Sequence, residues 1–446
     1  MARKEPIRAV KGMRDILPPE TALWNYIEET ARRVFCAYAY REIRTPLVEP
    51  TELFARGVGA DTDIVTKEMY TWDDRDQSSL TLRPEATASV IRAYIEHRLD
   101  QRPGVKKFYY LGPMFRRERP QKGRYRQFYQ IGAEAIGSES PAVDAEVIEL
   151  LVELLERLSI ARYTLLLNSV GCKQCRPRYV ELLREELRKI RQQLCADCQR
   201  RSETNPLRVL DCKVPEDQPL IDKLPTIAGS LCGNCQQHFD RVQDGLRERN
   251  IAYTFQPRMV RGLDYYTRTT FEFVHGALGA QNSLLGGGRY DGLSEDLGGP
   301  PAPGIGFSIG EDRLALTLQE ANHAALLAEA LYHSSPPPIY IAWMGAAAFR
   351  RAAQMARALR RKGQPIEMAP EDTKLKKSLE IASKMGAPYV LIIGDQELQE
   401  DRYVLRDMSS GEQRKVREED VLELCKRPEE LRAGALPVGQ RRENSP

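Results

Sequence analysis

The chain has 446 residues and a formal net charge of +3, with 42% hydrophobic and 29% charged residues. It is too long for one ordinary hydrophobic core, so we expect two or three globular domains. The small net charge excludes attraction of a polyanion by overall charge, so a nucleic acid would have to meet local basic clusters. No stretch approaches the roughly 20 apolar residues of a membrane span, and the N-terminus lacks the apolar segment of a signal peptide. We therefore expect a cytoplasmic protein with no membrane partner.

The first 169 residues mix helical and strand patterns without regular alternation. Residues 22–40 have apolar side chains at spacings of three and four, which predicts a helix. Residues 107–116 and 126–137 predict two strands of an antiparallel hairpin, joined by the polar loop 117–125. In the second strand, a period of two places on one face the side chains Phe128, Gln130, Gly132 and Glu134, and on the other Tyr129, Ile131, Ala133 and Ala135.

The composition changes several times beyond residue 169. Residues 170–245 hold seven of the nine cysteines and several charged helical runs, which indicates an inserted helical subdomain. Strand and glycine patterns return in residues 246–333, and the prolines at 334–338 predict an extended linker. Strand and helix then alternate over residues 339–425, a pattern typical of a small α/β domain. The polar tail, 426–446, is predicted to be disordered.

No nucleophile motif occurs in the sequence, and none of the five histidines lies in a catalytic pattern. Catalysis would therefore depend on positioning and electrostatics. Four arginines lie beside glycine or aromatic residues, where a guanidinium could either bind phosphate oxygens or form an ion pair: Arg116, Arg124, Arg261 and Arg313. The carboxylates of Glu85 and Glu134 lie in apolar or strand context and need partners there.

Several of these stretches, in this order, resemble the histidyl-tRNA synthetases, a family of class II aminoacyl-tRNA synthetases. The similarity covers nearly the whole chain. It is carried by KGMRDILP (11–18), EIRTPLVEPTELF (42–54), TLRPEAT (81–87), GPMFRRERPQKGRYRQFYQIGAE (112–134), RGLDYYTRT (261–269), GGGRYDGL (286–293) and GIGFSIGEDRL (304–314).

This resemblance implies an α+β fold, with the antiparallel-sheet catalytic core of class II synthetases, a helical Cys-rich insertion and a C-terminal α/β anticodon-binding domain. The core would comprise residues 1–169 and 246–333. It also implies a reaction in which ATP and L-histidine form histidyl-adenylate, from which tRNA(His) takes the acyl group. Neither step needs an enzyme nucleophile. ATP with Mg²⁺ and a homodimer that uses the first motif are implied as well.

The resemblance also assigns roles to particular residues. It implies that Arg116 and Arg124 hold the ATP phosphates, and that Arg313 lies near the adenine and γ-phosphate. Arg261 would contact the α-phosphate, and Arg261 and Arg116 would be the catalytic pair. For histidine, it implies that the α-amino group is bound by Glu85, Thr87 and Gln130, that the imidazole nitrogens contact Glu134 and Tyr266, and that the pocket is lined by Tyr265 and Tyr290.

A regulatory subunit of ATP phosphoribosyltransferase is the alternative, because it resembles the same core and senses histidine without catalysis. Such subunits lack the anticodon-binding domain and have eroded motif arginines, whereas this chain keeps both. Residues 350–384 hold ten basic and four acidic side chains. They could follow tRNA phosphates or form a solvated helix face.

The cysteines of residues 170–245 form three C-x-x-C pairs with one cysteine between the second and third pair. Any two pairs could close a tetrahedral zinc site. Seven thiols are one short of two such sites, and reduced, partly buried thiols are the alternative to structural Zn²⁺. The cysteines concerned are Cys172, Cys175, Cys195, Cys198, Cys212, Cys232 and Cys235.

Overall fold

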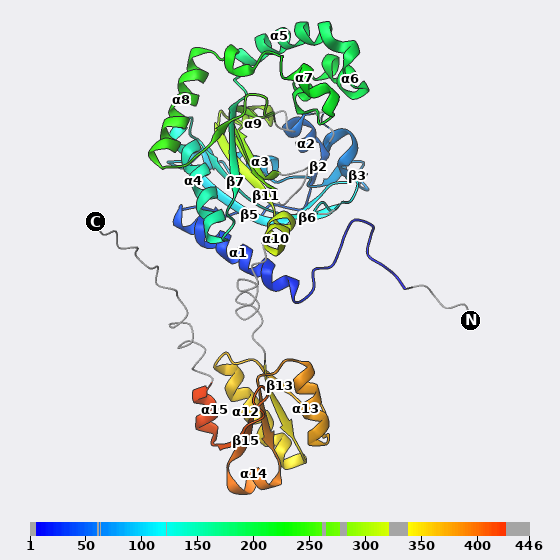
Figure 1. Cartoon of the computed structure of the whole chain (residues 1–446), viewed down its shortest axis with the longest axis vertical. Coiled ribbons are helices and arrows are strands. Elements are labelled where there is room, and N and C mark those ends of the chain that lie inside the picture. Colours follow the sequence, from blue (N-terminus) through cyan, green and yellow to red (C-terminus); the bar gives the residue numbers. More distant parts are fainter. Residues whose placement is uncertain are drawn as a thin grey trace, which may run out of the picture. The chain divides into compact units, whose positions relative to one another are not determined.

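The computed structural model describes residues 6–59, 62, 64–121, 123–260, 265–276, 283–320 and 338–424. The chain divides into two compact units, Met1–Leu327 and Ala328–Pro446 (Figure 1). Of the predicted linker at 334–338, only Pro338 is among the described residues, and the predicted tail at 426–446 lies outside them.

An eight-stranded sheet organises the first unit, in the order β1-β5-β6-β11-β10-β9-β7-β8. The five inner pairs are antiparallel, and only the outer pairs β1–β5 and β7–β8 are parallel. The antiparallel core predicted for this part of the chain is therefore confirmed. The strands are β1 (Arg41–Glu42), β5 (Lys106–Phe115), β6 (Gln127–Ile136), β7 (Tyr163–Ser169), β8 (Thr254–Phe255), β9 (Thr267–His275), β10 (Ser283–Arg289) and β11 (Gly304–Gly310).

One face of this sheet is covered by helices whose apolar stripes form the main core. The predicted helix at 22–40 is α1 (Glu20–Ala37), and it packs beside α4 (Pro141–Arg157) and α10 (Glu311–Glu320). The first turn of α4 is stabilised by Pro141 at its start and by the Ser140 hydroxyl, which accepts from the Ala142 N–H at 3.3 Å.

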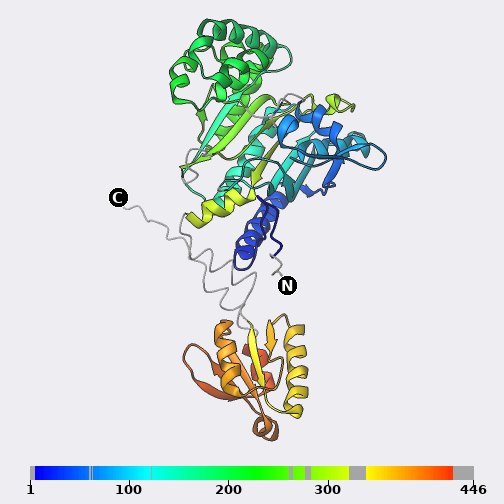
Figure 2. The same cartoon turned by 90° about the vertical axis from the view of Figure 1, so that its right-hand side faces the viewer.

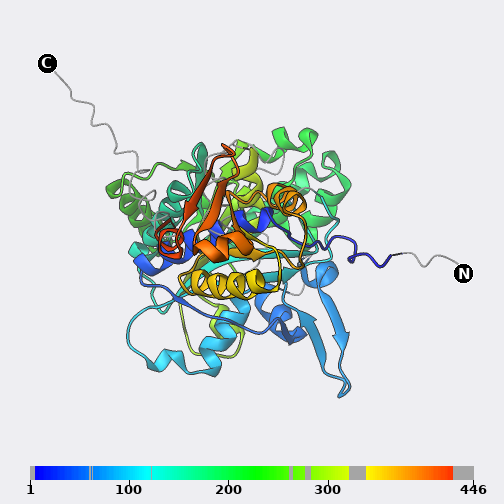
Figure 3. The same ribbon diagram turned by 90° about the horizontal axis from the view of Figure 1, so that it is seen from below.

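Smaller elements frame the other face of the sheet. These are α2 (Thr51–Val58), a π-helical turn (Ile64–Glu68), α3 (Thr87–Glu96), a 3₁₀ turn (Leu99–Gln101), α9 (Leu293–Asp296) and the sheet β2-β4-β3, made of β2 (Val48–Pro50), β3 (Tyr70–Asp73) and β4 (Ser79–Leu82). The β3–β4 hairpin projects outward, in lighter blue in Figure 3. No helix in the described ranges has the length and apolar character needed to cross a membrane.

The cysteine-rich segment forms a helical lobe at one end of the sheet, shown in green in Figure 2. Apolar side chains of its earlier helices pack together with the pocket side of the sheet, whereas its last helix packs on α4 in the main core. The segment is helical, as the sequence predicts. The lobe contains α5 (Cys175–Ile190), α6 (Ala196–Thr204), α7 (Gln218–Ile221), α8 (Gly233–Glu248) and the 3₁₀ turns Arg191–Gln193, Pro206–Asp211, Pro215–Asp217 and Ile227–Ser230.

The second unit is a five-stranded sheet in the order β13-β12-β14-β15-β16. Its first three strands are parallel, as the alternation of strand and helix predicts. The last two are antiparallel and were not predicted, because the apolar run Tyr403–Leu405 is only three residues long and residues 413–415 are polar. The elements are β12 (Ile339–Trp343), α12 (Ala346–Arg361), β13 (Ile366–Met368), α13 (Leu375–Lys384), β14 (Tyr389–Ile393), α14 (Asp395–Glu400), β15 (Tyr403–Asp407), β16 (Gln413–Val416) and α15 (Glu418–Leu424).

Candidate active site

The β5–β6 hairpin positions the floor of the site. Its strands pair in register from Phe115 opposite Gln127 to Lys106 opposite Ile136. The alternate side chains Ile131, Ala133 and Ala135 belong to the main core. Gln130 and Glu134 therefore face the opposite side, toward α3, as the period of two in the sequence predicts.

Glu134 is fully buried and accepts three hydroxyl hydrogen bonds. Thr87 donates to Oε1 at 2.7 Å, Tyr110 donates to Oε1 at 3.3 Å, and Tyr290 donates to Oε2 at 2.7 Å. Burial raises the pKa of Glu134 to about 8, although the hydroxyl donors oppose this shift. Gly306 on β11 leaves the space for this carboxylate, because a Cβ there would lie 1.7 Å from Oε2.

Tyr110 was not singled out in the sequence. It lies directly opposite Gly132 in the hairpin, and a Cβ at Gly132 would come within 2.4 Å of the Tyr110 ring and hydroxyl. Gly132 therefore makes room for Tyr110. The hairpin register was the signal that could have identified it.

Glu85 lies buried at the start of α3. Its carboxylate accepts from the backbone N–H of Thr87 at 2.7 Å and of Ala88 at 2.9 Å. Burial raises its pKa, and these backbone hydrogen bonds oppose the shift. The carboxylate thus satisfies two of the N–H groups that a helix leaves unpaired at its first turn.

A small pocket opens between α3 and strands β5, β6 and β11. Six of the seven residues predicted to bind histidine line it, and the seventh, Glu134, is hydrogen-bonded to three side chains of its wall. Gln130 Oε1 is buried and has no partner among the described residues. The lining residues are Glu85, Thr87, Tyr110, Arg116, Gln130, Tyr265, Tyr266, Tyr290, Gly306, Phe307 and Ser308.

Two of the predicted arginines share one carboxylate at the mouth of the hairpin. Arg116 lies 3.8 Å from Glu118 Oε1, and Arg124 donates to Glu118 Oε2 at 3.1 Å. Arg116 is further held by its Nε hydrogen bond to the Pro84 carbonyl at 2.9 Å and by stacking over Phe128, with 5.4 Å from its guanidinium carbon to the ring centre.

Of the other two predicted arginines, the structure describes only Arg313. Arg313, at the start of α10, donates to the Ser283 carbonyl. Burial lowers its pKa, and the positive charge of Arg124 lowers it further. Arg261 lies outside the described residues. The structure therefore describes three cationic groups at this site without the fourth.

Arg289, in the glycine-rich GGGRYDGL segment, supports the site structurally. Its side chain is fully buried. It donates from Nε to Asp144 Oδ1 at 2.9 Å and from Nη1 to Asp291 Oδ1 at 2.7 Å. Two charge-assisted partners satisfy the buried guanidinium. They fix the end of β10 just before Tyr290, which bonds to Glu134.

The raised pKa of Glu134 leads to a prediction about stability. Between about pH 4.5 and 8 the folded chain keeps this proton while an unfolded glutamate loses it, so the free energy of unfolding falls as pH rises. A glutamine cannot ionise. We expect the free energy of unfolding of Glu134→Gln to rise relative to that of the wild type by about 3–4 kcal/mol between pH 5 and pH 8, as measured by urea unfolding. A difference that is constant with pH would contradict the shift.

Taken together, the antiparallel sheet, the arginines at its central hairpin and the separate unit with a mixed sheet define a class II aminoacyl-tRNA synthetase. A family model of histidyl-tRNA synthetases matches residues 12–314, and a model of an anticodon binding domain matches residues 339–427. The chain belongs to the histidyl-tRNA synthetase family. The resemblance and the fold class predicted from the sequence are confirmed.

Relatives match along almost their whole length. The histidine–tRNA ligase of Solibacter usitatus is 61% identical over 416 residues, which covers 93% of this chain and 98% of that protein. The histidine–tRNA ligase of Koribacter versatilis is 55% identical over 423 residues, covering 92% and 94%. The crystal structure of apo S. aureus histidyl-tRNA synthetase is 36% identical, with a TM-score of 0.78, and covers 94% of this chain and 100% of that one.

Proposed function

We infer that this chain attaches L-histidine to tRNA(His) at the expense of ATP. The observation that carries this inference is the buried pocket in which Glu85, Gln130 and the tyrosine cluster meet Arg116. It occurs in a chain that is similar over more than nine-tenths of its length to histidine–tRNA ligases.

The α-amino group of histidine is assigned to Glu85, Thr87 and Gln130. A protonated amine carries three N–H donors, so it needs acceptors in a buried site. Gln130 Oε1, which has no partner within the described ranges, and the buried Glu85 carboxylate supply them. Both residues line the same pocket as Arg116.

The imidazole is assigned to Glu134 and Tyr266. In this assignment an imidazole N–H replaces one of the hydroxyls on Glu134, and the Tyr266 hydroxyl meets the other ring nitrogen. The rings of Tyr265 and Tyr266 lie 4.9 Å apart, and those of Tyr265 and Tyr290 lie 6.0 Å apart. A buried polar site of this kind rejects side chains that leave its groups unpaired, by a factor on the order of 10⁴.

ATP, as its Mg²⁺ complex, is assigned to Arg116, Arg124, Arg313 and Arg261. An oxygen of the histidine carboxylate forms a bond to the α-phosphorus, and the bond to the bridging oxygen breaks to release pyrophosphate. The terminal ribose hydroxyl of the tRNA then attacks the acyl carbon and AMP leaves. Mg²⁺ neutralises charge on the triphosphate, and the guanidiniums stabilise the charge that develops in the transition state.

The deciding experiment is histidine-dependent exchange of pyrophosphate into ATP. We expect exchange with histidine and none with other amino acids at the same concentration. Binding of histidine without exchange would instead support the regulatory alternative. That alternative is less well supported, because the chain has the second unit and keeps Arg116, Arg124 and Arg313.

The second unit offers a surface for the tRNA. Arg350 and Arg357 are exposed and lie two turns apart on one face of α12. We expect the double charge reversal Arg350→Glu with Arg357→Glu to raise KM for tRNA in charging by about 10-fold or more at moderate salt. Pyrophosphate exchange in the same protein is the control, and it should not change. Wild-type charging would contradict a phosphate contact at this face.

A homodimer and a cytoplasmic location also remain proposals. The motif at residues 42–54 supports the homodimer, and the proposed charging of tRNA(His) supports the location. Sedimentation of the purified chain tests the first: a monomer at micromolar concentration would contradict it.

A further inference from the structure

The seven cysteines of the insertion separate into two clusters in the folded chain. The first contains Cys172, Cys175, Cys232 and Cys235, and the second contains Cys195, Cys198, Cys212 and Asp217. Within each cluster one potential ligand atom from every residue lies within 4.8 Å of the others. The carboxylate of Asp217 therefore lies where the cysteine count is one ligand short of two four-ligand sites.

The first cluster has the dimensions of a tetrahedral thiolate site. The Sγ atoms of Cys172 and Cys175 are 3.7 Å apart, those of Cys172 and Cys232 are 3.9 Å apart, and those of Cys175 and Cys235 are 3.8 Å apart. Four sulfurs at about 2.3 Å from Zn²⁺ have edges of about 3.8 Å. A disulfide would bring two of them to about 2.05 Å.

The backbone around the first cluster favours thiolates. The Cys172 N–H donates to the Cys175 sulfur at 3.2 Å, and the Gln174 N–H donates to the Cys172 sulfur at 3.4 Å. Such donors to ligand atoms orient and stabilise a metal site. Gly171 has φ +69°, and a Cβ there would lie 2.7 Å from the Cys175 sulfur, so a larger residue would crowd the cluster.

The second cluster is closed by Asp217. Its Oδ2 lies 3.3 Å from the Cys212 sulfur, which lies 4.0 Å from the Cys195 sulfur. Sulfur and oxygen ligands of one tetrahedral Zn²⁺ lie about 3.5 Å apart. The Cys195 N–H donates to Asp217 Oδ1 at 3.0 Å, which holds the carboxylate in place. Asp217 is only 1% exposed, so its buried negative charge among the thiols favours a cation at this position.

We propose that the insertion binds two structural Zn²⁺ ions, one through four cysteines and one through three cysteines and Asp217. Each site has four protein ligands and no open position, which is the pattern of structural zinc. The arrangement uses all seven cysteines of the insertion and none outside it.

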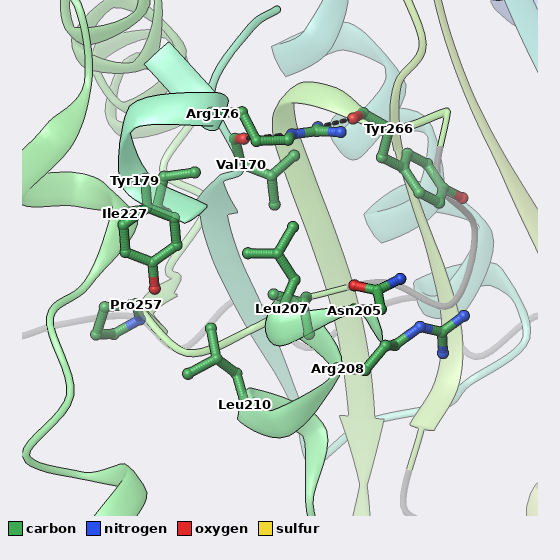
Figure 4. A pocket seen from close by; sticks show the side chains of 11 residues that line it. Val170, Arg176, Tyr179, Asn205, Leu207, Arg208, Leu210, Ile227, Pro257 and Tyr266 are labelled. Carbon is green, nitrogen blue, oxygen red and sulfur yellow. Dashed lines mark hydrogen bonds between the residues drawn. The ribbon is translucent and has the colours of Figure 1, made fainter. Parts of the chain in front are cut away.

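The first ion closes the insertion onto the catalytic core. Cys172 and Cys232 are 60 residues apart, and their meeting joins the beginning of the insertion to the beginning of α8. Next to Cys175, Arg176 donates to the Val170 carbonyl at 3.2 Å and to the Tyr266 carbonyl. Figure 4 shows these three residues in the wall of a second pocket. An ion at the first cluster therefore holds α5 against the segment that carries Tyr266.

The test is the zinc content of the full chain, purified without chelator and measured by mass spectrometry. We expect two zinc ions per chain in the wild type and in Cys36→Ser, a control that removes an exposed thiol outside both clusters. Asp217→Asn should retain one ion, because the amide is a neutral and weak ligand. Asp217→Cys should retain two, because a thiolate restores four ligands.

Three outcomes would overturn the proposal. Less than about half an equivalent of zinc in a folded wild-type chain would leave reduced thiols as the explanation for both clusters. One ion in the wild type and one in Asp217→Asn would remove the second site. Two ions in Asp217→Asn would show that the Asp217 carboxylate is not a ligand of the second site. These measurements do not depend on aminoacylation, so they stand or fall separately from the proposed function.

The link from the first site to the histidine pocket has its own readout. Removing zinc with a mercurial and a chelator is expected to raise KM for histidine in exchange by several-fold, with a smaller effect on KM for ATP. Equal changes in both would contradict a link through Tyr266.

Discussion

Glu134→Gln is expected to lower kcat/KM for histidine in pyrophosphate exchange by about 10²-fold or more. The carboxylate now accepts from Thr87, Tyr110 and Tyr290 in a fully buried position. Burial favours the protonated form of Glu134 in the free chain, whereas the N–H of a bound imidazole favours the ionised carboxylate. A glutamine cannot ionise, offers one acceptor oxygen in place of two and adds an N–H₂ donor. Each buried donor that is left unpaired costs about 1–3 kcal/mol, and 1.4 kcal/mol corresponds to about a factor of ten.

Selectivity should fall together with activity. We expect the ratio of kcat/KM for histidine to that for a ring-methylated histidine to narrow in Glu134→Gln, because the acceptor for the ring N–H is weakened. Glu139→Gln is the matched control: it lies five residues further on and its carboxylate is exposed, 3.3 Å from Arg268. Wild-type selectivity in Glu134→Gln would contradict the imidazole assignment.

Arg116→Ala is expected to lower kcat/KM for ATP in exchange by about 10³-fold, while the Kd for histidine changes only a few-fold. Its guanidinium is pre-oriented by the Pro84 carbonyl and by Phe128. Removing a pre-oriented donor to developing transition-state charge lowers kcat by about 10²–10³-fold. Loss of the cation also weakens binding of the triphosphate. Arg116→Lys should recover only part of the loss, because an ammonium cannot bind two oxygens in the planar fork geometry.

Arg117→Ala provides the matched control for this prediction. Arg117 is the next residue, yet it is exposed and its guanidinium lies over Tyr70, away from the pocket. We expect exchange within about three-fold of the wild type for this variant, since exposed side chains away from a site have small effects. Similar losses in both variants would mean that the hairpin loop is disturbed as a whole and would contradict a specific role for Arg116.

Much of the pocket that we assign to histidine could be predicted from local pattern. The period of two in residues 126–137 was sufficient to place Gln130 and Glu134 on the side away from the core, because alternation is a property of any strand. Tyr110 could not be found in that way. Its part depends on the pairing register that sets it opposite Gly132, and register is a relation between two strands.

The second unit also contains some strands that local pattern predicts and others that depend on pairing between strands. The strands at 339–343 and 389–393 are apolar and buried, so hydrophobicity alone predicts them. The strand at 413–416 carries Gln, Arg and Lys and buries only Val416, and the strand at 403–407 has an apolar run of three residues followed by Arg and Asp. They are strands because they pair with β14 and with each other, and pairing energy does not appear in composition.

The cysteine-rich insertion shows most clearly what the sequence pattern alone cannot predict. Spacing along the chain identified three C-x-x-C pairs, since two thiols on one turn are a local feature. Only the tertiary structure brings Cys172 to Cys232, 60 residues away, and sets Asp217 beside Cys195 and Cys212. A tetrahedral site needs ligands from separate segments, and which segments meet is decided by the packing of the helices that carry them, which the spacing of cysteines does not record.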